Sequence, residues 1–490
     1  MKKILKENKE KIILIIMAFI ISLRATSSIL NATNYLTNDV SVWTVLAKMM
    51  QEGRIVYSQI FDHKGPILYI IYFIGYAIGS KNGIWLIDFI CMVINSLAIY
   101  SIAKKFIKSN KTSLIATIVA MLGICILYDE NPGAESIALP FIFIALNKFI
   151  DFVLDYNKFG KKESIITGIC LGLALFIRPN LVALWVVYDL YIFFKLIKEK
   201  EVKKLINIIL YSLLGLGIVA LPIIAFFACN NALKDFFDTY IIFNLKYASG
   251  IKVNLWDVIT TFVITFITRT KGLMIYIFAT HIIAREYLLS DKKDNKNEIN
   301  LITINFIFYV LSMYLVLSPI RVYIHYANIL IPTAIIPLVI CCKNIEISNK
   351  VHNVLIMLSV IYVAVLLMGD SMTWSNYQTS RYDNIVAQAK IVENITNKED
   401  NVLQLGNVTA FYILSDRTYK GKYFYQDPII RYDSKIQEEF MEELSTNLPK
   451  VIVDYWGRYV ENSEFWKPIR KILDENYIRL ENDIYVLKEN

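Results

Sequence analysis

TNDVSVWTVLAKMMQEGRIVYSQIFDHKGP, residues 37–66, separates the first apolar segment of the chain from a long series of further apolar segments. The acid Asp39 stands shortly after the first segment, at residues 11–30. The polar cluster Asp62, His63 and Lys64 stands immediately before the next apolar run. Where this polar loop lies relative to a membrane therefore decides how the rest of the chain is interpreted.

The composition indicates a polytopic membrane protein. Of the 490 residues, 56% are hydrophobic, and the mean hydropathy is +0.46. The apolar runs repeatedly approach the length that crosses about 30 Å of hydrocarbon. The net charge of +8 comes from lysines clustered between these runs, which is typical of positive cytoplasmic loops rather than of nucleic-acid binding. No CxxC spacing occurs among the six cysteines, so neither a disulfide framework nor a cysteine metal site is indicated.

We expect a full membrane crossing wherever an apolar run is long enough to span. The first run follows a lysine-rich start and is expected to be a retained signal anchor. Eleven runs qualify: residues 11–30, 83–102, 112–128, 136–152, 164–177, 181–196, 205–228, 271–288, 301–317, 326–342 and 351–368. Two more, residues 67–79 and 255–268, are short for a crossing and are expected to be interfacial or re-entrant.

Charge in the loops sets the orientation. If residues 67–79 do not cross, the lysine-rich segments all fall on the side of the N-terminus, as the positive-inside rule requires. These segments are residues 104–111, 155–163, 195–204 and 291–298. Residues 129–135 (DENPGAE), without Lys or Arg, then fall outside. The sequence thus predicts a cytoplasmic N-terminus, an outer loop at about residues 31–66 and an extracytoplasmic C-terminus.

Two domains are expected, a membrane module at residues 1–369 and a small α/β domain outside the membrane at residues 370–490. The second carries amphipathic helix patterns at residues 383–396 and 434–446. Strand-like runs follow each pattern, NVLQLG and VIVDYW, and a terminal hairpin is expected to turn at residues 482–483.

Polar residues gather on the predicted outer face, where ionisable groups are costly unless they face water or a partner. They are Asp39, Asp62, His63, Lys64, Asp129, Glu130, Glu135, Arg178, Arg321, His325 and Tyr326. Each has a simpler interpretation by itself. Asp39 could cap a helix, and Lys64 could reach up to lipid headgroups. Glu130 and Glu135 could be solvated, Arg178 could be interfacial, and His325 with Tyr326 could belong to an aromatic belt.

Together the motifs resemble a known family. The first-loop acid, DHKGP before an apolar segment, the acidic loop at residues 129–135, RPN at residues 178–180 and HYANILIP at residues 325–332 occur in this order. The pattern is similar to the lipid-carrier-dependent GT-C glycosyltransferases, in the bacterial branch related to protein mannosyltransferases and the aminoarabinose transferases of lipid A. The resemblance extends from about residue 12 to residue 337.

The resemblance implies an enzyme that moves a sugar from a polyprenyl-phosphate carrier to a hydroxyl acceptor outside the membrane. Asp39 would be the base of a single inverting displacement, with Glu130 as a second catalytic acid, although Asp129 and Glu135 compete for that place. Cations would face the leaving phosphate: Lys64 first, then Arg178 and Arg321. Asp62, His63, His325 and Tyr326 would complete the substrate site.

Several points stay open at this level. A divalent metal held by Glu130, Asp62, His63 or His325 lacks diagnostic ligand spacing, so no cofactor is assigned. The acceptor could be a cell-envelope polymer, a lipid or a protein. A polymerase or ligase of lipid-linked glycans is one alternative function. A flippase or transporter is another, for which Asp88 and Asp189 inside apolar runs are the supporting residues.

Overall fold

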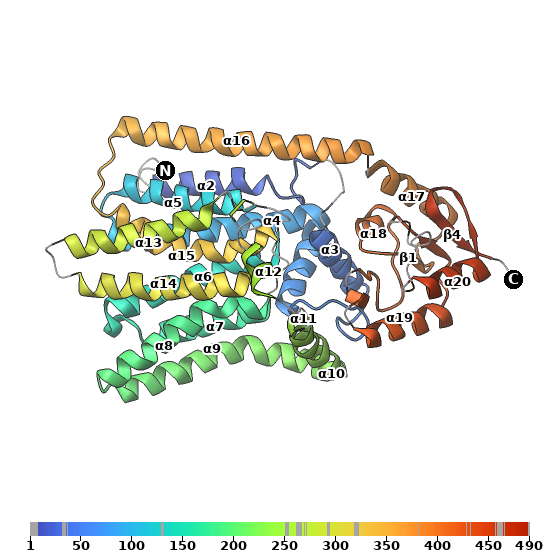
Figure 1. Cartoon of the computed structure of the whole chain (residues 1–490), viewed down its shortest axis with the longest axis horizontal. Coiled ribbons are helices and arrows are strands. Elements are labelled where there is room, and N and C mark those ends of the chain that lie inside the picture. The colour runs from blue at the N-terminus through green and yellow to red at the C-terminus, as the bar shows by residue number, and fades with distance from the viewer. Residues whose placement is uncertain are drawn as a thin grey trace.

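The computed structural model describes most of the chain, with gaps mainly in connecting segments. The described residues are 8–31, 36, 38–128, 132–249, 254–260, 267–268, 270, 272–291, 295–317, 323–380, 382–427, 429–431, 433–455, 457, 464 and 466–488. A bundle of helices forms one end of the molecule and a smaller mixed domain forms the other (Figure 1). The N-terminal helix lies in the bundle and the chain ends in the mixed domain, as the expected fold class requires.

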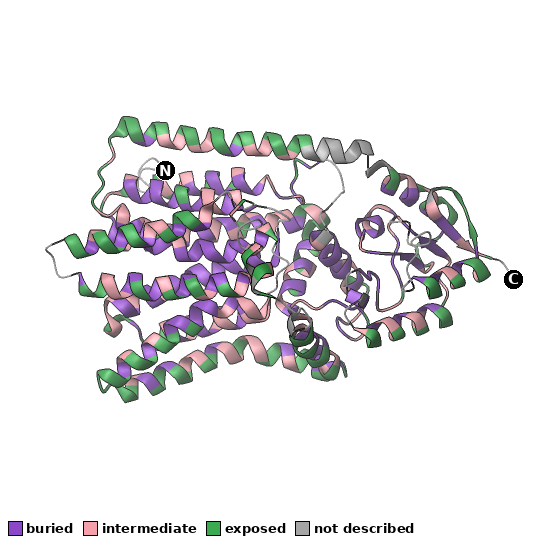
Figure 2. Ribbon diagram, in the orientation of Figure 1, coloured by how far each residue is buried: buried purple, intermediate pink, exposed green. Residues whose placement is uncertain are grey.

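The bundle helices follow the apolar runs. They are α2 (Lys9–Ser22), α4 (Pro66–Phe106), α5 (Asn110–Ile126), α6 (Ala134–Leu154), α7 (Lys161–Leu175), α8 (Ala183–Lys198), α9 (Val202–Cys229), α13 (Leu273–Ser290), α14 (Lys296–Leu317), α15 (Ile331–Cys341) and α16 (Asn349–Ser380). Within the described residues, eight helical segments are long and apolar enough to cross a membrane. Apolar side chains on the outside of α9 and α16 stay exposed while the bundle interior is buried (Figure 2). The chain is a multi-pass membrane protein.

Helix α4 is broken near its middle, at Gly79 and Ser80. Ser80 has φ 51° and ψ −129°, outside helical geometry. A Cβ atom on Gly83 would lie 2.0 Å from the carbonyl oxygen of Gly75, so the two halves of α4 fold back on each other. The first half, residues 66–78, rises about 20 Å, which is short of the ~30 Å needed to cross. This geometry agrees with the expectation that residues 67–79 do not span.

Short helices connect the long ones. They are α3 (Asn38–Gln51), η2 (Pro179–Val182), α10 (Leu233–Phe236), the π-helix η3 (Phe237–Phe243), α11 (Asn244–Ser249), α12 (Leu255–Thr260) and η5 (Ile324–Leu330). A further 3-10 turn, η1 (Tyr156–Lys158), connects α6 to α7. Figure 1 shows α3 between the bundle and the C-terminal domain. Of the predicted 255–268 segment, residues 261–266 lie outside the described residues, and α12 begins the segment.

The C-terminal domain is built on one small sheet. It contains α17 (Tyr382–Ile395), β1 (Val402–Gln404), α18 (Ala410–Leu414), η6 (Ile429–Arg431), α19 (Ser434–Thr446), β2 (Val451–Val453), α20 (Lys467–Asn476), β3 (Tyr477–Arg479), η7 (Glu481–Asp483) and β4 (Ile484–Leu487). The strand order is β1-β2-β4-β3, with β1 parallel to β2 and the other pairs antiparallel. The predicted helices, strands and hairpin are confirmed. Helix α16 runs through the expected domain boundary at residues 369–370 and delivers the chain to this domain.

Candidate functional site

Two turns at the membrane surface are joined through their backbones. The Gly65 amide donates to the Ile177 carbonyl at 3.0 Å, and the Ile67 amide donates to the Phe176 carbonyl at 3.0 Å. A Cβ atom on Gly65 would lie 1.9 Å from the Phe176 oxygen, so only glycine allows this approach. Lys64 and Arg178, which are far apart in the sequence, therefore lie in adjoining turns.

Arg178 is held from two sides. Its guanidinium forms an ion pair with Glu135, at the start of α6, and lies 4.2 Å from the centre of the Tyr326 ring. Glu135 is only 3% exposed, so the pair is largely removed from water. Burial alone would lower the pKa of Arg178, but Tyr326, Glu135 and Asp39 together raise it. Arg178 is thus a fixed cation.

Lys64 is held by its neighbour in the chain. Its ammonium group lies 3.0 Å from His63 Nε2, and His63 Nδ1 lies 3.3 Å from Asp62 Oδ1. Burial and the Lys64 charge lower the pKa of His63. If the neutral ring accepts a hydrogen bond from the Lys64 ammonium group on Nε2, it carries its own proton on Nδ1, which lies toward Asp62. The carboxylate, the imidazole and the ammonium group thus lie in series, with the carboxylate close to Nδ1 but outside hydrogen-bond geometry.

Asp62 is a buried carboxylate surrounded by donors. Oδ2 accepts hydrogen bonds from Trp43 Nε1 at 3.1 Å and from the Tyr69 hydroxyl at 2.8 Å. Oδ1 accepts one from the Tyr425 hydroxyl at 2.6 Å. Burial alone would raise the pKa of Asp62, but His63, Lys64 and Tyr425 lower it, so the group is ionised. Its oxygens are committed to protein donors.

Asp39 differs from the other acids of this surface. It lies in the first turn of α3, where the helix dipole favours a carboxylate, and it is partly exposed. Its charge acts on Arg178, His63 and Tyr326, so it faces both cation-bearing turns. Among the described residues no hydrogen bond or ion pair is formed by the Asp39 side chain. Its oxygens can accept a proton without breaking an internal contact.

The remaining predicted residues fall into two groups. His325 and Tyr326 lie in η5, with their rings 4.9 Å apart, and His325 also stacks on Tyr323 at 5.5 Å. Because Tyr326 contacts Arg178, η5 belongs to the same surface. Asp129, Glu130 and Arg321 lie outside the described residues, whereas Glu135 is described as the partner of Arg178.

Among the residues that the structure describes, no group of three or more His, Cys, Asp or Glu could hold a metal ion.

Tyr425 was not among the predicted site residues. It belongs to the C-terminal domain and stands 363 positions from Asp62, its hydrogen-bond partner. No local spacing relates the two residues, and a buried tyrosine in a small α/β domain is an ordinary core residue. The contact comes only from the packing of that domain onto the loop at residues 37–66.

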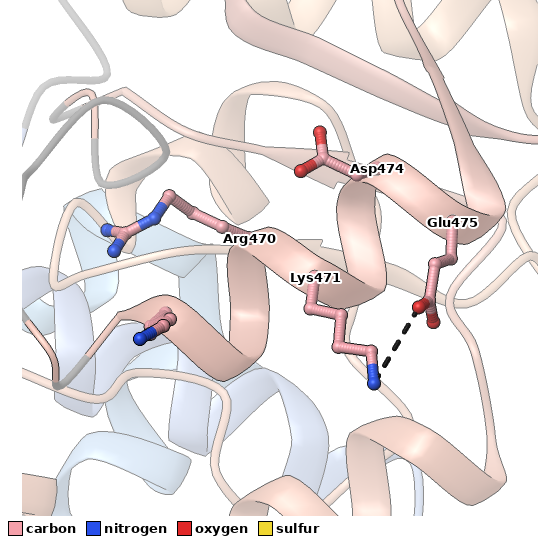
Figure 3. Close-up of a pocket in the computed structure, with 5 residues that line it drawn as sticks. Arg470, Lys471, Asp474 and Glu475 are labelled. Carbon is pink, nitrogen blue, oxygen red and sulfur yellow. Dashed lines mark ion pairs between the residues drawn. The ribbon is translucent and has the colours of Figure 1, made fainter.

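A separate pocket of about 490 Å³ lies on the C-terminal domain. Helix α20 supplies its lining, which consists of Lys467, Arg470, Lys471, Asp474 and Glu475 (Figure 3). Lys471 and Glu475 pair along the helix at 3.8 Å. The pocket contains none of the predicted site residues, and its charges are those of a solvated helix face.

The acids inside the bundle have different surroundings. Asp88, on α4, is buried and accepts a hydrogen bond from the Tyr128 hydroxyl. Asp189 lies on an exposed face of α8. Within the described residues these two acids therefore do not form a joint polar site in the bundle.

Comparisons with known proteins agree on the fold. The model of the competence-induced Ccs4 N-terminal domain family matches residues 2–359. Two crystal structures of ArnT from Cupriavidus metallidurans are similar to the chain at 9% identity. The structure bound to undecaprenyl phosphate has a TM-score of 0.62 and covers 97% of each chain. The apo structure has a TM-score of 0.60, with 92% of this chain and 93% of that chain covered. No curated protein matches. The expected GT-C fold is confirmed.

Proposed function

Because this chain belongs to the competence-induced Ccs4 N-terminal domain family and has the fold of ArnT, we propose that it is an integral-membrane glycosyltransferase. It moves a sugar from a polyprenyl-phosphate carrier to a hydroxyl acceptor on the outer face of the membrane. The crystal structure of ArnT with undecaprenyl phosphate supports a carrier of this kind. The acceptor is a cell-envelope glycan, a lipid or a protein.

The reaction is a single inverting displacement at the anomeric carbon. The acceptor oxygen forms a bond to that carbon while the bond from the carbon to the phosphate oxygen breaks. Asp39 takes the proton of the acceptor hydroxyl, and the polyprenyl phosphate leaves as an anion. Glu130 and Arg321, which complete the sequence motif, are assigned supporting roles on the same face.

One observation carries this proposal: a carboxylate with no hydrogen bond or ion pair in the described residues lies close to the fixed cation Arg178, whose turn adjoins that of Lys64. The hydrogen bonds of Gly65 and Ile67 bring the turns of Lys64 and Arg178 together, and the charge of Asp39 acts on Arg178. Phosphate departure requires positive charge that is already in place, because cations held in position do not have to reorganise as the negative charge develops. Arg178 suits planar contact with phosphate oxygens, and Lys64 supplies a point charge.

The test is a transfer assay on the full chain in lipid vesicles that contain a polyprenyl-phosphate sugar. Asp39→Asn should reduce turnover by about 10²–10⁴-fold, the range of a lost general base. The variant should keep the unfolding temperature of the wild type, since Asp39 forms no hydrogen bond or ion pair within the described residues. Glu52→Gln, an exposed acid just after α3, is the matched control and should retain turnover.

Two results would contradict the proposal. Turnover close to wild type in Asp39→Asn would remove the base assignment. Movement of intact lipid-linked glycan across the vesicle membrane without transfer of sugar would identify a flippase rather than a transferase.

A further inference from the structure

The loop at residues 37–66 is covered by a segment of the C-terminal domain, residues 409–425. The two segments meet in the same chain order. The contacts are Ser41 Oγ with Thr409 Oγ1 at 2.7 Å, Lys48 Nζ with Asp416 at 2.7 Å, Arg54 Nη1 with the Tyr419 carbonyl at 2.6 Å, Arg54 Nη2 with the Gly421 carbonyl at 2.7 Å, and the Phe61 amide with the Lys422 carbonyl at 2.9 Å. The domain thus lies on this loop along most of its length.

One contact reaches the polar cluster of Asp62, His63 and Lys64 directly: the hydrogen bond from the Tyr425 hydroxyl to Asp62. Both side chains are buried, Asp62 at 2% and Tyr425 at 6% exposure. A buried carboxylate is stable only when donors replace the water that it has lost. Trp43 comes from α3, Tyr69 from α4 and Tyr425 from the C-terminal domain, so three separate parts of the chain supply these donors. Oδ1, which Tyr425 contacts, is also the oxygen that faces His63.

Asp62 in turn determines the state of His63 and Lys64. A carboxylate opposite Nδ1 favours the ring with its proton there, and Nε2 is then free to accept from the Lys64 ammonium group. The backbone of this segment is fixed separately. The Tyr57 hydroxyl donates to the Lys64 carbonyl at 2.7 Å, and Asn244 donates to the His63 carbonyl at 2.7 Å. The Lys64 backbone is thus held by contacts that do not involve Asp62.

We propose that Tyr425 is a positioning residue by which the C-terminal domain completes the donor site: its hydroxyl holds Asp62, which fixes the His63 tautomer and thereby aims Lys64. The inference rests on the proposed function only in taking the lipid phosphate as the partner of Lys64. The C-terminal domain is, in this view, a part of the transferase site rather than an appended unit.

The test compares Tyr425→Phe with Tyr423→Phe in the full chain. Tyr423 is a matched control, because its hydroxyl donates to Glu439 inside the C-terminal domain. The first measurement is the rate of chemical acylation of the Lys64 amine, followed by mass spectrometry. Loss of a hydrogen bond to a charged group should raise this rate by about ten-fold in Tyr425→Phe and leave it unchanged in Tyr423→Phe.

The second measurement is affinity for undecaprenyl phosphate in detergent. Tyr425→Phe should raise Kd by about ten-fold, and in turnover it should raise the donor KM more than it lowers kcat. In an Asp62→Asn background, Tyr425→Phe should change the acylation rate of Lys64 by less than about two-fold, because Asp62, the residue through which Tyr425 acts, is already altered. If Tyr425 were only structural, the effects of Tyr425→Phe and Asp62→Asn on the acylation rate would add in the double variant.

The two proposals fail in different ways. An unchanged Lys64 rate in Tyr425→Phe, or additive effects with Asp62→Asn, would overturn the positioning role whatever the chain catalyses. If the wild type does not bind undecaprenyl phosphate, the donor assignment fails, while the Lys64 rates still decide whether Tyr425 positions that side chain.

Discussion

The guanidinium of Arg178 shows how a cation is kept charged at this membrane surface. Glu135 pairs with it and the Tyr326 ring covers it, so removal of Arg178 leaves a carboxylate that is 3% exposed without its partner. We expect Arg178→Ala to lower the free energy of unfolding by about 3–5 kcal/mol. The double variant Arg178→Ala/Glu135→Ala should lose less, because it leaves no unpaired charge. Thermal unfolding in detergent measures both, and equal losses in the two variants would contradict this account of the pair.

His63 gives the stability of the protein a dependence on pH. Burial and Lys64 lower its pKa, so the unfolded chain takes up this proton before the folded one does. Stability should therefore fall as the pH drops below about 6.5, the ordinary histidine value, and should rise again as the pH increases. Asp62, whose pKa is also lowered, contributes fully above about pH 4 and so adds nothing to the slope between pH 5 and 7.

The measurement is unfolding of wild type and His63→Gln across pH 5 to 7.5. The chain has four histidines, so the difference between the two curves isolates His63. We expect the slope of the variant to be smaller than that of the wild type. Parallel curves would mean that His63 has the same proton affinity in the folded and unfolded chain.

At the scale of elements, the junction of the turns at Gly65 and Phe176 is the most sensitive point. Gly65→Ala would bring a Cβ atom to within 1.9 Å of a backbone oxygen, which cannot move away as a side chain does. We expect this substitution to separate Lys64 from Arg178 and to weaken donor binding at least ten-fold. Gly79→Ala is the matched control, because its φ of −174° is extended backbone and no atom lies within 4 Å. Equal affinities in the two variants would show that the close approach is not required.

Elements differ in how well their sequence predicts them. Each of the eleven predicted crossings lies at a helix, but three of these helices, α2, α5 and α7, are not among the eight described segments long and apolar enough to cross. Strands β1 and β2 lie where Val, Ile and Leu cluster, because apolar periodicity records burial directly. Helix α20 was not predicted, although Ile469 and Leu473 have helical spacing and are both buried. Its charged residues outnumber its apolar ones, so the pattern is easily read as a loop. The break at Ser80 could not be predicted, because no sequence feature marks a serine that adopts a positive φ.

At the scale of the whole molecule, the side of the membrane on which the site lies remains a prediction from loop charge. Cysteine labelling tests it, with single cysteines introduced at the exposed Glu52 and Gly160 in a background in which the exposed Cys229 is replaced by Ser. We expect an impermeant reagent added outside to label the cysteine at position 52 and not that at position 160. The lysine-rich loops and the first loop then lie on opposite sides. The reverse labelling would invert the proposed orientation.

At this scale, the sequence predicts some site residues and misses others. Asp39, Lys64 and Arg178 could be placed on one face, because loop charge orders every crossing relative to the others. The pairing of Arg178 with Glu135 could not be foreseen, since three acids compete in the DENPGAE loop. Tyr425 could not be found, because its partner is set by the docking of a whole domain.

That docking has a consequence for the order in which the protein is made. The loop at residues 37–66 is synthesised early, but Tyr425 follows Asp62 by 363 residues, which at typical translation speeds takes about 20–70 s. During this interval the nascent chain has its early membrane helices and its loop, while Asp62 still lacks one of its donors. The ribosome must finish α16, the last helix of the bundle, and the part of the C-terminal domain up to Tyr425 before Asp62 gains this donor. Until then the chain lacks the contact that, in our proposal, aims Lys64 at the lipid phosphate.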